Sequence, residues 1–253
     1  MKRALLIFLF VWIGGTAGLF AATRAEINIL EAAENIRFLS QEITKNYLYL
    51  YANPRRTAIK NRLNRNLDRM VENIRTISTT TSDEDTKNIL EFLTYSKDQI
   101  EQLIKKRPDK ESAALMLDYS ESLLEGANSI SAAHAYEFSE REKMLMKSKA
   151  ILFQLERSTK YYIALYIGLG TSINIEQMNQ STKKLQELLE TVYKFPYPDA
   201  IEEKKSRLRD IWSVVESIIS KRQKFFIVEV VNLASNELKN QMEPFIIYHR
   251  KNQ

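Results

Sequence analysis

Cysteine is absent from this 253-residue chain, which excludes disulfide scaffolds, cysteine-based zinc sites, iron–sulfur sites and thiol nucleophiles. Turn-forming residues are scarce as well, with six glycines and five prolines. That share is far below what disordered, collagen-like or turn-rich all-β chains require. Hydrophobic residues make up 44% of the chain, so it can bury a sizeable core. So few breaks in so long a chain predict long helices.

Histidine is nearly absent too, and the sequence carries no catalytic motif. His134 and His249 lie far apart and form no ligand pattern. There is no Gly-rich phosphate loop, no G-x-S-x-G nucleophile elbow and no H-E-x-x-H pair. The acids at 83–85 and 202–203 stand at predicted helix starts, where the helix dipole favours negative charge. We therefore expect a protein that is not an enzyme and holds no metal and no cofactor.

The excess of positive charge is small, at a formal net charge of +5. Much of it is local, because six Lys and Arg residues gather over positions 55–69. Acidic residues are interspersed nearly everywhere else in the sequence. This pattern is typical of a solvated helix face and not of a nucleic-acid interface, so no nucleic-acid partner is expected.

Residues 1–24 predict an export segment. A short positive start at residues 1–3 precedes an apolar run over 4–13, and small residues follow at 14–17. These features fit a secretory signal peptide that is cleaved after Ala17. The stretch 4–22 is also long enough for an uncleaved inner-membrane anchor. Both alternatives stay open, and both predict that the rest of the chain lies in the periplasm.

The remainder has a helical hydrophobic pattern, with apolar residues at i, i+3, i+4 and i+7. Prolines, a Ser/Thr cluster and one Gly-rich stretch separate the predicted helices. Pro244 predicts a kink or an early end of the last helix. The predicted helices cover about residues 25–52, 57–77, 83–107 and from 109 onward in the first half, and about 135–167, 173–193, from 199 onward and 225–249 in the second.

The second half of the sequence repeats the plan of the first. The predicted fold is therefore all-α, with two consecutive up-and-down four-helix bundles over residues 25–134 and 135–253. No Gly/Ser/Pro-rich linker separates the halves, and residues 129–140 are compatible with helix. One continuous helix joining the bundles is therefore a further expectation.

One segment carries a family resemblance. Residues 35–48 resemble the signature of the PilJ-type domain, the periplasmic sensor region of type IV pilus methyl-accepting chemotaxis proteins, which is related to the NarX-like nitrate/nitrite sensor region. A degenerate second copy of the motif lies at residues 140–147. The matching positions of the first copy are Arg37, Leu39, Ser40, Gln41, Ile43, Lys45, Tyr47 and Leu48.

The resemblance implies a helical-bundle sensor domain in which an arginine of the motif binds a small oxyanion such as nitrate. Arg37 is the matching position, Ser40 and Gln41 would add hydrogen-bond donors, and Lys143 is the equivalent in the second copy. A guanidinium suits this role because it is always charged and offers a fork of donors. The alternative is that Arg37 simply pairs with Glu34 or Glu42 on a wet helix face.

Two functions follow as expectations. The first is an exported sensor-type helical-bundle protein, similar to chemotaxis receptors, that binds a small anion or a partner membrane receptor. The second is a structural or adaptor protein of the cell envelope or pilus machinery that binds no ligand. The resemblance also implies a homodimer.

Overall fold

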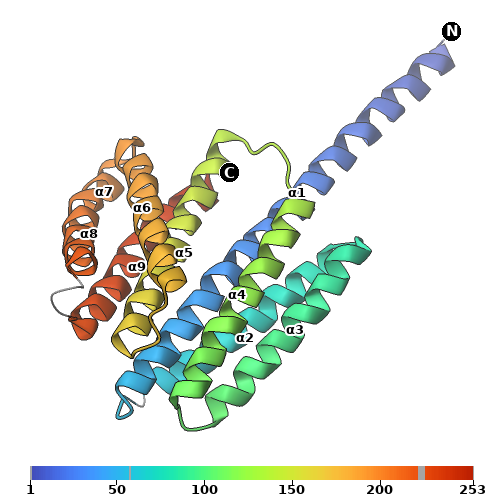
Figure 1. Ribbon diagram of the computed structural model, residues 1–253. Coiled ribbons are helices and arrows are strands. Elements are labelled where there is room, and N and C mark those ends of the chain that lie inside the picture. The colour runs from blue at the N-terminus through green and yellow to red at the C-terminus, as the bar shows by residue number, and fades with distance from the viewer. Residues whose placement is uncertain (1, 57, 222–225, 253) are drawn as a thin grey trace.

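The computed structural model describes residues 2–56, 58–221 and 226–252, and it describes side chains from residue 24 onward. Within these ranges the regular secondary structure is all helical, with short connections between the helices and no strand (Figure 1). The all-α prediction is confirmed. The helices are α1 (Lys2–Ala52), α2 (Ala58–Thr80), α3 (Glu84–Lys105), α4 (Lys110–Ala133), α5 (Glu140–Tyr166), α6 (Ser172–Lys194), α7 (Asp199–Glu202), α8 (Lys204–Ser220) and α9 (Val228–Lys251).

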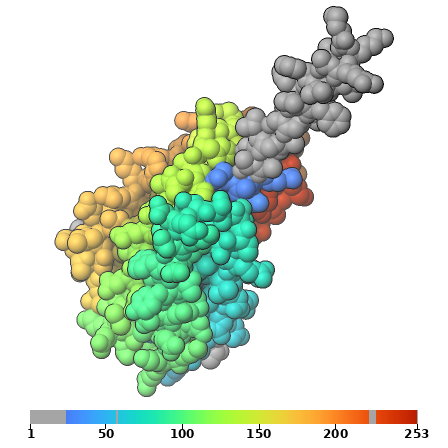
Figure 2. Space-filling model, turned by 90° about the vertical axis from the view of Figure 1, so that its right-hand side faces the viewer, coloured from blue at the N-terminus to red at the C-terminus, as the bar shows by residue number. Residues whose placement is uncertain are grey.

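The first four helices form one bundle, in which α1 packs against α2 and α4, and α3 covers both of these partners. Aspartates cap two of the helices. The Asp83 side chain accepts a hydrogen bond from the backbone N–H of Thr86, and Asp109 accepts one from Ser112, at 2.8 and 2.7 Å. Such caps satisfy backbone donors that a helix leaves free at its start. Figure 2 shows α3 and α4 on one outer face of the molecule.

The second bundle consists of α5, α6, α8 and α9, in which α5 packs against α6 and α9. The one-turn helix α7 follows Pro198 and leads into α8. Pro244 lies inside α9, which continues to Lys251, so the predicted early end is wrong.

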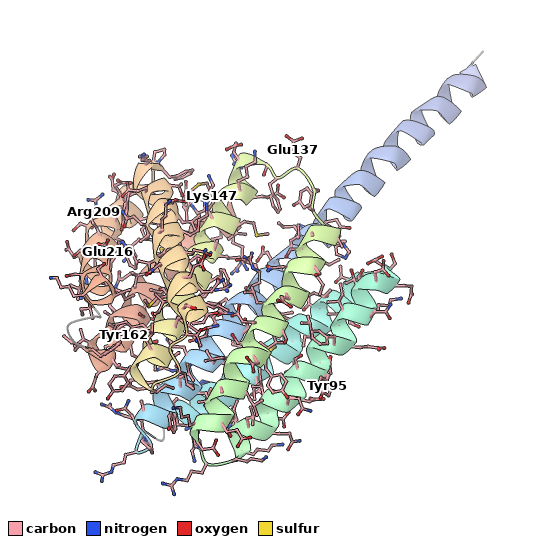
Figure 3. All side chains as sticks on the ribbon, viewed as in Figure 1. Tyr95, Glu137, Lys147, Tyr162, Arg209 and Glu216 are labelled. Carbon is pink, nitrogen blue, oxygen red and sulfur yellow. The ribbon has the colours of Figure 1, made fainter. Side chains whose placement is uncertain are left out.

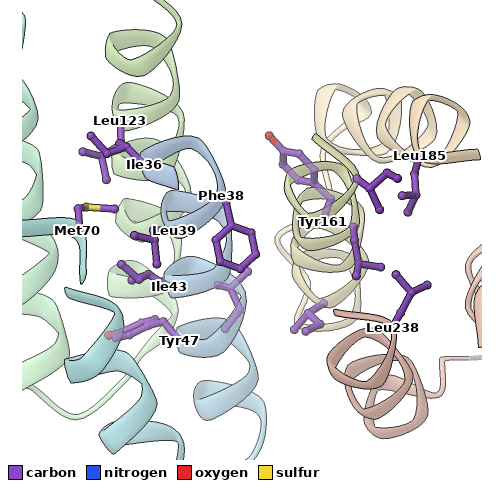
Figure 4. Packing of buried hydrophobic residues seen from close by; sticks show 14 of the residues in the cluster. Ile36, Phe38, Leu39, Ile43, Tyr47, Met70, Leu123, Tyr161, Leu185 and Leu238 are labelled. Carbon is purple, nitrogen blue, oxygen red and sulfur yellow. The ribbon is translucent and has the colours of Figure 1, made fainter. Parts of the chain in front are cut away.

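The two bundles meet along α1 and α5, which pack directly against each other. Their buried apolar side chains belong to one continuous cluster. Figure 4 shows Ile36, Leu39 and Ile43 facing the interior of the first bundle, while Phe38 lies on the side of α1 toward the second. In accordance with this orientation, the Lys239 ammonium of α9 lies 5.7 Å from the centre of the Phe38 ring.

The expected continuous helix between the bundles is wrong. Helix α4 ends at Ala133, and α5 begins only at Glu140, not near residue 135. Ser139 starts α5 with a capping box, because its hydroxyl accepts from the Glu142 N–H and the Glu142 carboxylate accepts from the Ser139 N–H. His134 holds the end of α4 by contacts of its ring nitrogens with Thr86 Oγ1 at 2.9 Å and Glu26 Oε2 at 2.8 Å.

The predicted export segment falls on residues whose side chains, up to position 23, lie outside the described part. Within the described part of the chain, no helix combines the length and the apolar character that crossing a membrane requires.

Candidate functional site

Two of the predicted site residues, Arg37 of α1 and Lys143 of α5, line the same pocket. The pocket has a volume of about 380 Å³ and lies where α1, α5 and α6 approach the connection between the bundles. We call it the Arg37 pocket. Its lining is mainly apolar and comprises Leu30, Glu34, Arg37, Ser131, Ala135, Phe138, Lys143, Met146, Lys147, Ala150 and Leu188.

The connection after α4 forms one wall of the pocket through Ala135 and Phe138. Local contacts fix the shape of this segment. The Tyr136 ring meets the Phe138 ring edge-on at 4.8 Å, and the Tyr136 hydroxyl donates to Glu142 Oε1 at 2.8 Å. Figure 3 shows this connection, marked by Glu137, next to the start of α5, with Lys147 further along that helix. The break between the bundles therefore builds part of the site.

Arg37 is held by contacts within the protein. Its Nη1 donates to Glu34 Oε2 at 2.6 Å, and its guanidinium lies 4.5 Å from the centre of the Phe153 ring. Arg37 therefore pairs with Glu34, one of the two partners considered as the alternative to a ligand. The other, Glu42, pairs with Lys239. The Arg37 side chain is nonetheless only 25% exposed, and its Nε is buried without a hydrogen-bond partner. The Nε donor of the guanidinium thus remains unused.

Lys143 forms a weak surface pair. Its Nζ lies 2.7 Å from Glu140 Oε1, and the Glu140 side chain is 88% exposed. The hydrogen bond from Lys143 lowers the pKa of the Glu140 carboxyl, and the charge of Lys147 adds to this effect. An exposed pair of this kind is easily exchanged because water screens the attraction.

Lys147 is the residue that sequence analysis missed. It lines the Arg37 pocket and is half-buried, yet within the described ranges its Nζ has neither a hydrogen bond nor an ion pair. Its position four residues after Lys143 places both lysines on one face of α5. This i, i+4 spacing in the second motif copy is the signal that identifies it.

Ser40 and Gln41 are not brought to the pocket. Both are fully buried. The Ser40 hydroxyl donates to the Arg37 carbonyl at 2.8 Å, and the Gln41 amide donates to Ser40 Oγ at 2.9 Å. Their donors are therefore used inside the protein, and neither residue belongs to the lining of the Arg37 pocket, while the Gln41 side-chain oxygen is buried without a hydrogen-bond partner.

The part of the chain that the structure describes contains no group of three or more His, Asp or Glu side chains placed to hold a metal ion. Its two histidines have structural contacts. His249 Nε2 lies 2.7 Å from the Tyr197 hydroxyl inside a cluster of aromatic rings, and burial lowers the pKa of His249.

Comparison with known proteins finds no matching family model, no matching curated protein and no matching solved structure. The chemistry of the Arg37 pocket is therefore the basis for a functional proposal.

Proposed function

We propose that this chain is a non-enzymatic, sensor-type binding protein whose Arg37 pocket takes a small organic anion. The ligand has one negatively charged head and a short apolar body. The observation that carries the proposal is Lys147, a half-buried lysine in a mainly apolar pocket whose Nζ forms neither a hydrogen bond nor an ion pair among the described residues.

Charge supports this assignment. Three cations and one acid line the pocket, and the acid, Glu34, already pairs with Arg37. Lys143 has only an exposed partner, so the pocket holds more positive than negative charge. Arg37 and Lys147 are partly buried, and water screens the charge of a partly buried cation less than that of a fully exposed one.

Shape selects among anions. The walls formed by Leu30, Phe138, Met146 and Leu188 offer apolar surface that a bare oxyanion such as nitrate does not use. A carboxylate with a hydrocarbon or aromatic body buries that surface, at about 25 cal/mol for each Å² removed from water. Such a ligand uses both chemistries of the pocket.

A thermal-shift panel tests the proposal. The purified chain is heated with nitrate, acetate, hexanoate or benzoate at constant ionic strength. An anion present at 100 times its dissociation constant stabilises the folded state by about 2.7 kcal/mol. We expect hexanoate and benzoate to raise the melting temperature more than nitrate or acetate, and Arg37→Ala to reduce the rise.

Lys60→Gln is the matched control because Lys60 is an exposed lysine of α2 outside the pocket lining. If no anion shifts the melting temperature, or if the shift is the same in Arg37→Ala as in the wild type, the proposal is wrong.

Export to the periplasm remains part of this proposal. N-terminal sequencing of the protein isolated from the cell envelope distinguishes cleavage after Ala17 from an intact anchor over residues 4–22. A cytoplasmic, uncleaved and soluble product contradicts both alternatives.

A partner-binding or adaptor role is the second candidate function, and one surface feature favours it. Apolar side chains gather near the junction of α5 and α9, where the Tyr166 and Phe226 rings lie 5.9 Å apart. Ile227, Val230 and Leu233 are exposed on the same stretch of chain, Leu233 by 60%. Exposed apolar patches of this kind often mark interaction sites.

Photo-crosslinking in living cells from a probe at position 233 tests the adaptor role. A single envelope protein captured in a probe-dependent way supports it. The absence of any crosslinked product, while the probe is incorporated and the chain is folded, counts against it.

A further inference from the structure

A second cleft lies at the seam between the bundles. It has a volume of about 290 Å³ and is lined by residues of α1, α2, α5 and α9. We call it the seam cleft. Its cations are Arg69, Lys149, Lys239 and Arg250, its acids are Glu34 and Glu243, and its remaining lining includes the amides Asn35 and Asn240.

One end of the seam cleft holds two cations on a single carboxylate. Lys149 Nζ lies 3.0 Å and Arg250 Nη2 3.4 Å from the same oxygen of Glu31. The Lys149 side chain is only 5% exposed, and it also donates to Asn35 Oδ1 at 2.9 Å. Burial lowers the pKa of Lys149 even though Glu31 opposes the change. This end is therefore short of negative charge.

The other end holds Lys239 and Arg69. Lys239 pairs with Glu42 and lies 3.6 Å from Glu156 Oε1, which is itself the partner of Lys45. Arg69 is exposed, and its guanidinium has no hydrogen bond or ion pair within the described ranges. It is near enough to Glu42 to contribute to the lowered pKa of that carboxyl.

The residues that line the seam cleft include more cations than acids. The cations are Arg69, Lys149, Lys239 and Arg250, and the acids are Glu34 and Glu243. Glu34 is already paired with Arg37, whereas Glu31, Glu42 and Glu156 neutralise part of the positive charge from outside the lining. The Lys149 and Lys239 side chains are only 5% and 22% exposed, so water screens their charges little.

We infer that the seam cleft is a second anion site, which binds a small organic anion with two or more negative charges, such as a di- or tricarboxylate. One carboxylate lies against Lys149 and Arg250, and another lies against Arg69 and Lys239. Phe38, Leu152 and Ile246 supply apolar surface between the two ends for the carbon skeleton. Carboxylates suit these partners because arginine forms charge-assisted, often bidentate, hydrogen bonds with them.

The site joins parts of the chain that no single bundle contains. Arg69 belongs to the first bundle, whereas Lys149, Lys239 and Arg250 belong to the second. A bound polycarboxylate therefore holds the two bundles together at the seam. The inference does not depend on the Arg37 pocket, because Arg69 and Arg250 lie outside that lining.

Citrate, succinate and acetate are the probes, added to the purified full chain at equal ionic strength so that general screening stays constant. At saturating levels, about 100 times the dissociation constant, we expect citrate to raise the melting temperature by about 5–10 °C. Succinate follows with a smaller rise, and acetate gives none. Arg69→Gln should reduce citrate affinity at least about tenfold, since Arg69 is the arginine of the described cleft lining that has no ion pair.

Two variants sharpen the test. Glu243→Gln removes an exposed acid from the lining, so citrate affinity should increase severalfold. Lys147→Gln disrupts only the Arg37 pocket and should leave the citrate response unchanged, which keeps the two sites distinguishable. Lys60→Gln controls for net charge. The inference is overturned if citrate gives no shift, if Arg69→Gln responds like the wild type, or if Lys60→Gln loses the response equally.

Discussion

Several lysines of this protein are buried at positions where an apolar residue would ordinarily lie. Lys45 and Glu156 form a pair at 2.7 Å in which both side chains are 0% exposed, and this pair links α1 to α5. Lys160 is equally buried between Ser120 and Glu121. Such charges are tolerated only when paired, because an isolated ion loses its hydration on burial. The buried pairs fix which helix faces meet. Within each pair, one charge is stable in the interior only while its partner is present.

Removal of one member of the Lys45–Glu156 pair should destabilise the protein strongly. We expect Lys45→Met to lower the free energy of unfolding by about 3 kcal/mol, because Glu156 is left with only the more distant Lys239. Urea denaturation followed by circular dichroism measures the loss. Lys87→Met is the control, since the Lys87–Glu84 pair is exposed and its loss should have a far smaller effect.

The double variant Lys45→Met/Glu156→Leu should recover at least about half of that loss, because it removes the stranded carboxylate as well. Equal stability of Lys45→Met and the wild type would contradict a buried pair.

Lys160 should make stability depend on pH in the alkaline range. Burial lowers its pKa to about 8 from the ordinary value of 10.5, although Glu121 opposes the change. Between these two values the unfolded chain binds more protons than the folded chain, so stability gained from this residue rises with pH. We expect the free energy of unfolding of the wild type, relative to Lys160→Met, to increase from pH 7.5 to 9.5.

Urea titrations of both proteins at several pH values provide that difference. A flat or falling difference would mean that Lys160 keeps its proton throughout. Lys160→Met is a suitable reference because it does not leave Glu121 without a partner: Arg157 Nη2 still lies 2.7 Å from Glu121 Oε2.

At the scale of the helices, the sequence predicted most elements. The helical spacing of apolar residues and the positions of helix-breaking residues indicate the same boundaries. Proline stops α1 after Ala52, and Asp109 caps α4 as its position suggested. The stretch between α4 and α5 misled the prediction because its residues have adequate helix propensity. Propensity is a weak prior there, and the Ser139–Glu142 capping box together with the contacts of His134 ends the helix instead.

The capping box is therefore expected to support both α5 and the pocket wall. Ser139→Ala should lower the melting temperature by about 2–4 °C, which corresponds to about 1 kcal/mol for a chain of this size. Hydrogen exchange should quicken at the first amides of α5. Ser129→Ala serves as the control because Ser129 is an exposed mid-helix residue whose hydroxyl donates only to Glu125 O. Unchanged exchange at 140–143 would show that the cap contributes nothing.

At the scale of the whole molecule, the two halves share one apolar cluster, and the charges between them lie at the seam. The sequence predicted two bundles but gave no sign of how they meet. Long-range pairs such as Lys239 with Glu42 join positions that no local pattern relates. The two motif copies pointed to Arg37 and Lys143 as equivalent positions, but only the structure shows that they line one pocket. The seam cleft likewise arises only when α2, α5 and α9 converge on α1.

Ser40 and Gln41, the predicted hydrogen-bond donors beside Arg37, also show that a local pattern does not predict long-range packing. Helical spacing placed Ser40 and Gln41 within one turn of Arg37, but spacing along one helix does not say which neighbour covers them. Packing against the rest of the bundle buries both, and the lysine at the same spacing on α5, Lys147, lines the pocket instead.

The central claim is that Lys147 holds the head of a small organic anion in the Arg37 pocket. Isothermal titration calorimetry of benzoate or hexanoate into the wild type, Lys147→Gln and Lys60→Gln tests it most directly. We predict one site per chain, affinity at least about tenfold weaker in Lys147→Gln, equivalent to about 1.4 kcal/mol, and unchanged affinity in Lys60→Gln. Equal affinity of Lys147→Gln and the wild type, or no binding of either anion by the wild type, would contradict the claim.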